Sequence, residues 1–333
     1  MGGEIWNRDK PVTEPLRKRV LTQRESRRWV ETAEAARPAL ASAALVTFVA
    51  DREGDIYPLW ARAPAEGFHV LNRVMSDRRL ADRPKGETLY KAAAGFPLAE
   101  TRTISLPARP PGRAARDARV EIRFGAVEIA RPVNEKDRTL AASVRLYLVE
   151  VTEPDPPPGT KAVHWRQLTT HPVEDLARAW QIVAWYQVRW TIEQLFRTMK
   201  SQGFGLEESQ LQTAEGLMKL AAVAAKAACI DMQLVQERDG AHGLSIATVF
   251  DEAEAATIEA LNPTLEGKTA RQQNPHKPGS LARACWVVAR LGGWNCYGHP
   301  PGPITFHRGM ERFKAIHQGR MLGPKVLRDV RID

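Results

Sequence analysis

Four polar side chains at fixed spacing lie in the segment WYQVRWTIEQLFRTMKS and could hold a metal ion against a phosphate. They are Tyr186, Arg189, Glu193 and Lys200. At about 100° per residue of helix, their spacing places all four within one narrow stripe. The carboxylate of Glu193 can bind divalent metal ions, whereas the positively charged side chains of Arg189 and Lys200 and the phenol of Tyr186 can bind phosphate oxygens. The alternative is an ordinary surface ion pair, because Arg189 and Glu193 also have i, i+4 spacing.

The apolar residues of this segment fall on a separate face, between roughly 180° and 280° from Tyr186. This pattern predicts one long helix from about Val173 to Lys200, with a buried apolar face and the polar stripe at its border. The residues of the expected buried face are Trp185, Val188, Ile192, Leu195, Phe196 and Met199.

A second group of carboxylates begins with Asp51, directly after the short apolar run ALVTFVA (Ala44–Ala50). The run is rich in β-branched residues and is followed by charge, so it predicts a buried strand over 44–50. Carboxylates at strand ends commonly build the sites of α/β proteins. Asp51 therefore is a candidate metal ligand, although Asp51 and Asp55 could instead simply cap a turn.

The elements around these motifs alternate between helix and strand. TQRESRRWVETAEAA predicts a helix over 22–36, capped by Thr22 with Glu25 in a capping box and ended by Pro38. Further strands are expected over 68–74 and 162–170. An apolar, alanine-rich helix is expected over 217–237, buried in the protein.

Residues 78–157 have a different character. The short β-like runs TRTISL, RVEIRFGAVEI and SVRLYLVEV are separated by turns rich in arginine and proline. This pattern predicts an inserted β-rich module with a basic surface, closed by the stiff linker PDPPPG. The arginines of this module either follow a DNA backbone or belong to a solvated turn; they are Arg102, Arg109, Arg113, Arg116 and Arg119.

The composition of the 333 residues is that of a globular protein with a basic balance. Lys and Arg number 48 against 39 Asp and Glu, which gives a formal net charge of +9 and suggests a polyanionic partner. There is no 18-residue apolar run and no apolar signal-peptide core near the N-terminus, so we expect a cytoplasmic protein without a membrane span. The cysteines lack metal-ligand spacing and are expected to be reduced. His164, His171 and His276 also lack ligand spacing, and we interpret them as structural or surface residues.

The spacing Tyr-x2-Arg-x3-Glu-x6-Lys resembles the YREK signature of the insertion-sequence-four family of DDE transposases, without a gap or substitution. The segment after Asp51 resembles this family's second-aspartate motif, and Arg73 resembles the arginine on the next strand. The β-rich insertion between Asp51 and Glu193 resembles the family's split core. The stretch over 274–309 resembles its C-terminal region.

The resemblance implies an α/β, RNase H-like (retroviral integrase-like) core and a DNA transposase of the cut-and-paste type. Asp51 and Glu193 would be catalytic and would ligate two divalent ions, Mg²⁺ or Mn²⁺, for phosphodiester cleavage and strand transfer. The implied DNA-binding residues are Arg73, Trp165, Tyr186, Arg189, Trp190 and Lys200. For Tyr186 simple packing is an alternative; for the two tryptophans, core packing is the alternative to stacking on an unpaired base.

The expected domains are 1–77, the first part of the catalytic core; 78–160, the β-rich insertion; 161–240, the second part of the core with the Glu193 helix; and 241–333, a helical dimerisation region. The expected partners are double-stranded DNA, from transposon ends and target, and a second copy of the chain in a synaptic complex. We expect the protein in the bacterial cytosol, associated with the nucleoid.

The resemblance begins in the middle of the family pattern, so the first catalytic aspartate and the early strands are expected to be missing. Asp9 lies in a segment that resembles a later passage and does not replace that aspartate. A truncated copy would have two of three catalytic carboxylates and would not cleave DNA at a useful rate. The alternative function is a non-catalytic DNA-binding or dimerising fragment that inhibits full-length transposase.

Overall fold

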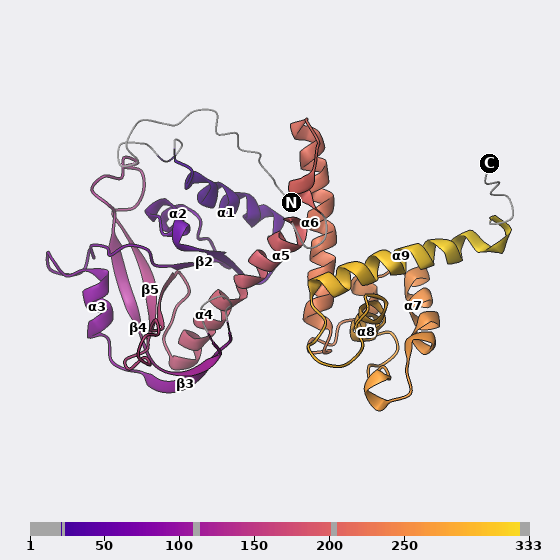
Figure 1. Cartoon of the computed structure of the whole chain (residues 1–333). Coiled ribbons are helices and arrows are strands. Elements are labelled where there is room, and N and C mark those ends of the chain that lie inside the picture. Colours follow the sequence, from indigo (N-terminus) through magenta and orange to yellow (C-terminus); the bar gives the residue numbers. More distant parts are fainter. Residues whose placement is uncertain (1–20, 22–23, 109–113, 201–204, 327–333) are drawn as a thin grey trace. The chain divides into compact units, whose positions relative to one another are not determined.

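A computed structural model describes the chain except for residues 1–20, 22–23, 109–113, 201–204 and 327–333 (Figure 1). The chain divides into two compact units, Met1–Trp190 and Thr191–Asp333. The first unit contains the β-sheet of the described residues, and the second is helical. Asp9 and Thr22, named above, lie outside the described residues.

The first unit is built on a mixed six-stranded sheet with the order β1-β2-β6-β5-β4-β3. β1 and β2 are parallel, and every other neighbouring pair is antiparallel. The strands are β1 (Val46–Ala50), β2 (Phe68–Arg73), β3 (Glu100–Leu106), β4 (Arg116–Ala130), β5 (Ser143–Thr152) and β6 (His164–Thr169).

All the expected strands are present, and the strands of the β-rich segment belong to the same sheet as β1 and β2. β5 pairs with β6 from Tyr147↔Thr169 to Thr152↔His164, so the segment extends the sheet beyond β6. The predicted division into four domains stays a prediction. Within the first unit, however, the basic strands and the strand that ends at Asp51 share one hydrogen-bonded framework.

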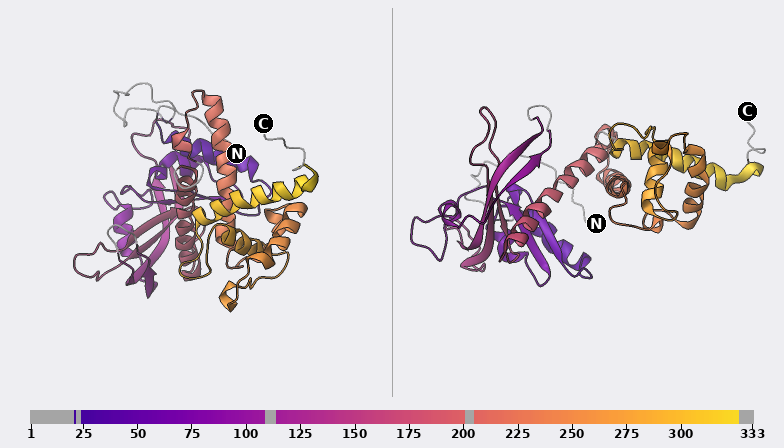
Figure 2. Two further views of the ribbon diagram at one scale, coloured as in Figure 1. Left: turned by 45° about the vertical axis from the view of Figure 1, so that its right-hand side comes forward. Right: turned by 90° about the horizontal axis from the view of Figure 1, so that it is seen from below.

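Helices cover both faces of this sheet (Figures 1 and 2). On one face, α1 (Arg27–Ala39), α2 (Tyr57–Arg62) and α3 (Leu89–Gly95) enclose a core around Trp60. The indole Nε1 of Trp60 donates to Asn72 Oδ1 at 2.7 Å, which satisfies two buried polar groups. On the other face, α4 (Leu176–Val188) packs its buried residues against β4, β5 and β6.

Two expected helix boundaries are wrong. α1 begins at Arg27 after the N-cap residue Ser26, which makes no side-chain capping bond, and Pro38 lies inside its last turn. The long helix expected from Val173 to Lys200 is interrupted: α4 begins at Leu176 and ends at Val188, and α5 (Trp190–Lys200) follows Arg189. The Arg189 N–H bonds to the Tyr186 carbonyl oxygen at 3.1 Å, an i→i−3 closure that tightens the turn at the break.

The apolar face along α4 and α5, which we expected to be buried, is only partly buried. Met199 is 8% exposed and packs with α6, and Leu195 packs beside it. In contrast, Val188, Ile192 and Phe196 are 63%, 41% and 50% exposed. Helical periodicity identified the face, but periodicity alone does not supply a partner for it.

The second unit is helical, as expected for the C-terminal region. Its main helices are α5, α6 (Ala214–Glu237), α7 (Glu252–Leu265), α8 (Leu281–Leu291) and α9 (Pro303–Val326). α8 is the central helix: most of its residues are buried, and Trp286 packs with Phe306 and Phe313 of α9. Asp251 and Glu254 form a capping box that starts α7.

α6 is less buried than its composition predicts, since Met218 and Val223 are 45% and 66% exposed. The three cysteines are unpaired thiols, and Cys285 lies in the core of the second unit. Among the described residues, no helix is both long and apolar enough to cross a membrane.

Candidate functional site

Asp51 stands where β1 leaves the sheet and begins the short helix η3 (Arg52–Gly54). Its Oδ1 accepts a hydrogen bond from the Glu53 backbone N–H at 2.8 Å. The turn-capping role is therefore present, through one oxygen of a half-exposed carboxylate. A carboxylate has further lone pairs, so this cap is compatible with a second ligand.

Asp55 has a different role from Asp51. Its buried carboxylate accepts hydrogen bonds from the backbone N–H groups of Met75 and Ser76 at 2.8 and 2.9 Å, and it pairs with Arg78 at 3.0 Å. The Arg78 guanidinium in turn lies 4.7 Å from the centre of the Trp60 ring. Asp55 thus ties the segment after β2 to the core and is a structural residue.

The first unit brings four of the predicted site residues into electrostatic contact. Burial raises the pKa of Tyr186, while Arg189 and Arg73 oppose this shift, and Asp51 adds to it. Arg189 also donates a side-chain hydrogen bond to Tyr186. These residues come from the ends of β1, β2 and α4, so the fold joins parts of the chain that are distant in sequence.

Arginines crowd around this position. Burial lowers the pKa of Arg73, and the neighbouring positive charges of Arg52 and Arg189 lower it further. A cluster of like charges is costly unless an anion compensates it, and guanidinium groups bind phosphate oxygens with matching geometry. The cluster is consequently a candidate phosphate-binding position. Sequence reasoning missed Arg52, although it follows Asp51 directly.

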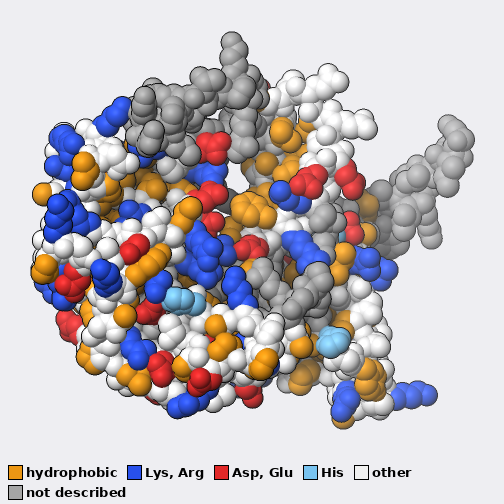
Figure 3. Space-filling view, turned by 60° about the vertical axis from the view of Figure 1, so that its left-hand side comes forward, with side chains coloured by type: hydrophobic (Ala, Val, Ile, Leu, Met, Phe, Trp, Pro, Cys, Tyr) orange, Lys and Arg blue, Asp and Glu red, His pale blue; other side chains and the backbone are white. Residues whose placement is uncertain are grey.

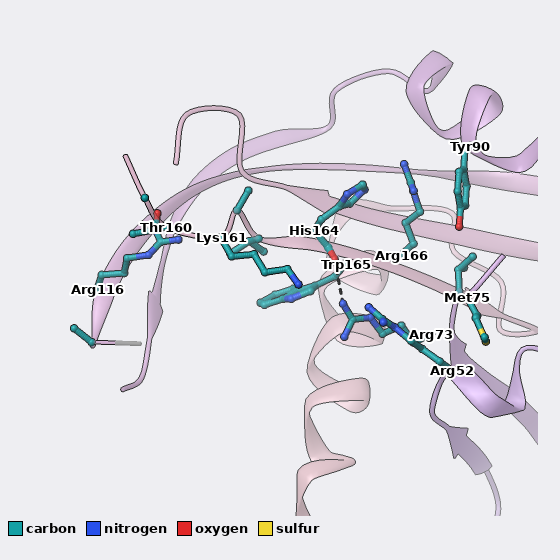
Figure 4. A pocket seen from close by; sticks show the side chains of 15 residues that line it. Arg52, Arg73, Met75, Tyr90, Arg116, Thr160, Lys161, His164, Trp165 and Arg166 are labelled. Carbon is teal, nitrogen blue, oxygen red and sulfur yellow. Dashed lines mark hydrogen bonds between the residues drawn. The ribbon is translucent and has the colours of Figure 1, made fainter. Parts of the chain in front are cut away.

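A groove of about 810 Å³ opens beside this cluster, entirely within the first unit (Figure 4). One side of the groove is formed by strand β6 and the turn before it. The other sides are formed by residues that include Arg52, Arg73 and Tyr90. Lys and Arg side chains recur across the face of the protein shown in Figure 3. The labelled lining residues are Arg52, Arg73, Met75, Tyr90, Arg116, Thr160, Lys161, His164, Trp165 and Arg166.

The two tryptophans predicted to stack on a base are both partly accessible. Trp165 lines the groove, although it also packs against the core below α4. Trp190 is 41% exposed, with the Arg189 guanidinium 5.4 Å from its ring centre. Each thus combines core or cation–π contacts with an exposed portion, and their stacking on DNA stays a prediction.

Glu193 and Lys200 lie on α5, and both are exposed. Lys200 forms an ion pair with Glu207 of the short helix η4 (Leu206–Glu208) at 3.0 Å, which is an exposed contact of little energetic weight. Asp51 belongs to the first unit and Glu193 to the second, so their joint coordination of metal ions stays a prediction. Within the described residues, no three His, Cys, Asp or Glu side chains form a metal-binding group.

The predicted basic turn is in part structural. The Arg102 guanidinium lies 4.0 Å from the Trp180 ring centre, and Arg116 pairs with the buried Glu153 at 2.8 Å, although Arg116 also lines the groove. Arg119 is exposed. Arg109 and Arg113 lie outside the described residues.

The histidines without ligand spacing also have structural contacts. His164 pairs with Glu150 at 2.9 Å, and His171 is 3% exposed. His276 is partly buried, and its backbone N–H donates to the Asn274 side chain.

The geometry agrees with a comparison to known protein families. Residues 23–230, more than half of the chain, match the family model described as "Transposase DDE domain". The chain belongs to this family, so it is a DDE transposase protein. The mixed α/β architecture of the first unit fits such a domain.

Proposed function

We propose that this chain acts in DNA transposition of the cut-and-paste type, by binding transposon-end DNA and directing phosphodiester cleavage and strand transfer. The observation that carries this proposal is the grouping of Asp51, Arg73, Tyr186 and Arg189 beside a basic groove. A carboxylate next to several phosphate-binding groups supplies part of what phosphodiester chemistry needs, namely a metal ligand and contacts to the phosphates. The proposed fold is an RNase H-like core with the YREK signature of the insertion-sequence-four family.

The donor set proposed for the metal ions is chemically suitable. Asp51 and Glu193 provide hard carboxylate oxygens, which Mg²⁺ and Mn²⁺ prefer, and Asp51 is already oriented by its bond from the Glu53 N–H. Divalent ions at such a site would activate the attacking oxygen and stabilise the leaving oxyanion.

The remaining residues of the site would position the DNA. Arg73 and Arg189 would bind phosphates next to the scissile bond, and the Tyr186 O–H would donate a hydrogen bond to a phosphate oxygen. A raised pKa keeps that phenol protonated as a donor. Lys200 would add a further phosphate contact, and Trp165 and Trp190 would stack on bases.

The test is a DNA-binding and cleavage assay on a plasmid. The plasmid carries the genomic DNA that encodes this chain, together with the flanking DNA that would contain the transposon ends. The purified chain is expected to bind this DNA with an affinity that falls as salt rises, as phosphate-dominated binding does. Any cleavage seen with Mg²⁺ or Mn²⁺ should disappear in Asp51→Asn and in Glu193→Gln, whereas the exposed control Glu66→Gln should cleave like wild type. The proposal would be wrong if the chain bound no DNA, or if both variants cleaved normally.

The same assay separates the second candidate function. Binding without cleavage would favour a non-catalytic DNA-binding or dimerising fragment that inhibits full-length transposase. We further propose that residues 241–333 pair two copies of the chain in a synaptic complex. Light scattering of the chain with and without end DNA measures this pairing directly.

A further inference from the structure

Arg166 of β6 is held as a fixed, flat surface at one side of the groove. Its Nε donates a hydrogen bond to Glu150 Oε1, and its Cζ lies 3.9 Å from the centre of the Tyr90 ring. Glu150 is 4% exposed and also contacts His164 at 2.9 Å. Tyr90 belongs to α3, so two elements clamp the guanidinium from its edge and from one face.

This clamp gives Arg166 a different chemistry from the other cations of the groove. Glu150 compensates its charge, so a phosphate gains less from it than from an uncompensated cation. In the described residues, Arg52, Arg73 and Lys161 line the same groove without an ion pair to a carboxylate. The groove thus combines phosphate-binding positions with a neutralised planar group, and planar guanidinium groups stack on nucleic-acid bases.

Arg166 and the Tyr90 ring behind it, here called the Arg166–Tyr90 platform, lie where strand β6 extends past its neighbour β2. The pairing of β2 with β6 ends at Arg73↔Gln167, and just beyond it the Val74 N–H still donates to the Arg166 carbonyl oxygen at 2.9 Å. The β6 edge past this bond consists of His164 and Trp165. Alternation along the strand sends Trp165 to one face and His164 and Arg166 to the other (Figure 4). The Arg73 Nη2 donates to the His164 carbonyl oxygen at 3.3 Å and so covers part of this edge.

We propose that the groove binds an unpaired stretch of single-stranded DNA that crosses the β6 edge, with one base stacked on the Arg166–Tyr90 platform. Arg52, Arg73 and Lys161 hold the phosphates of this stretch. An intact duplex does not offer a base face to Arg166, because its bases are stacked on one another. The inference rests on the proposed function and adds to it the form of DNA that this face of the sheet binds.

The experiment measures binding of the full chain to three fluorescein-labelled probes by anisotropy. The probes are a short oligothymidylate, an abasic phosphodiester of the same length and charge, and a duplex of matched length. We expect the oligothymidylate to bind roughly tenfold or more tightly than the abasic probe, since stacking on a protein platform depends on the base.

Arg166→Lys is the diagnostic variant, because it keeps the charge and removes the plane. It should weaken oligothymidylate binding by roughly fivefold or more and leave abasic binding unchanged. Tyr90→Leu should act in the same direction, since it removes the ring behind the guanidinium. The matched control is Arg145→Lys on β5, an exposed arginine 5.9 Å from the Tyr147 ring and outside the groove lining. It should bind all three probes like wild type.

The outcomes separate this inference from the proposed function. Equal affinity for the oligothymidylate and the abasic probe, or unchanged binding by a folded Arg166→Lys, would overturn the platform while leaving DNA binding in place. Duplex binding without single-strand binding would do the same. Failure to bind any probe would count against both proposals. Circular dichroism melting of each variant establishes that the fold is retained.

Discussion

The imidazole rings of His69 and His171 stack with their centres 3.9 Å apart, between the sheet and α4. The Nε2 atom of His171 also shares a hydrogen bond with the Thr47 hydroxyl at 2.9 Å. The centre of its ring lies 4.8 Å from that of the Trp185 ring. Burial lowers the pKa of His171 to about 4, helped by the charges of His69 and Arg178. Burial also lowers the pKa of His69, so both rings of the stack are uncharged at neutral pH.

This stack predicts an acid-sensitive first unit. The unfolded chain binds a proton at His171 near pH 6.5, whereas the folded chain does so only near pH 4. Stability is thus full above about pH 6.5 and falls as the pH drops toward 4, by about 2–4 kcal/mol for this group. Chemical denaturation of wild type and His171→Phe between pH 4 and 7.5 measures it. In His171→Phe, the free energy of unfolding should no longer show this decrease between pH 6.5 and 4. The exposed control His299→Phe should show the same decrease as wild type.

Substitution of the two aspartates in the segment ADREGDIY should destabilise the protein to different extents. Asp51→Ala removes one cap bond of a three-residue helix and should cost about 1 kcal/mol of stability. Asp55→Ala leaves Arg78 and two backbone N–H groups without their buried acceptor and should cost about 3–5 kcal/mol. Urea denaturation gives both values. A large loss for Asp51→Ala, or a negligible one for Asp55→Ala, would contradict these roles.

Local sequence patterns were sufficient to predict the strands of the first unit. The apolar run before Asp51 and the alternation in SVRLYLVEV depend on neighbours within a few residues, and β1 and β5 lie there. The helical nature of the C-terminal region could be predicted for the same reason. The break at Arg189 could not, because it results from one tightened turn in an otherwise helical segment.

The groove could not be predicted because its contacts depend on strand register. Nothing near Arg166 in sequence indicates that Glu150 lies opposite it, and Tyr90 reaches it only because α3 packs on that face. The phosphate-binding candidates Arg73, Tyr186 and Arg189 were predicted from a family resemblance, and the first unit does bring them together. The β-rich segment resembled a separate module because sequence alone does not show which strands pair.

Asp231 of α6 should make the second unit less stable as the pH rises. The residue is 2% exposed, and burial together with the charge of Glu311 raises the pKa of its carboxyl group from 3.8 to about 7. The folded state therefore binds more protons than the unfolded state between about pH 4 and 7, so stability falls across that range. His307 approaches it at 3.4 Å.

Substitution at Asp231 tests this assignment. Asp231→Asn should raise the melting temperature of the second unit more at pH 8 than at pH 4.5. The exposed control Asp239→Asn should change it equally at both values. Equal effects of Asp231→Asn at the two pH values would show that ionisation of the buried Asp231 carboxyl group does not destabilise the second unit.

Two glycines of α9 provide a matched pair for the packing of α8 against α9. A Cβ atom at Gly309 would lie 2.0 Å from the Val288 carbonyl oxygen, whereas one at Gly319 would meet nothing within 4 Å. Gly309→Ala must push apart two backbones in the core and should cost about 1–3 kcal/mol or more. Gly319→Ala should instead stabilise the helix by about 0.5–1 kcal/mol, because alanine is the better helix former. Thermal melts of the two variants should therefore shift in opposite directions, and a stabilising Gly309→Ala would mean that α8 and α9 do not approach this closely in solution.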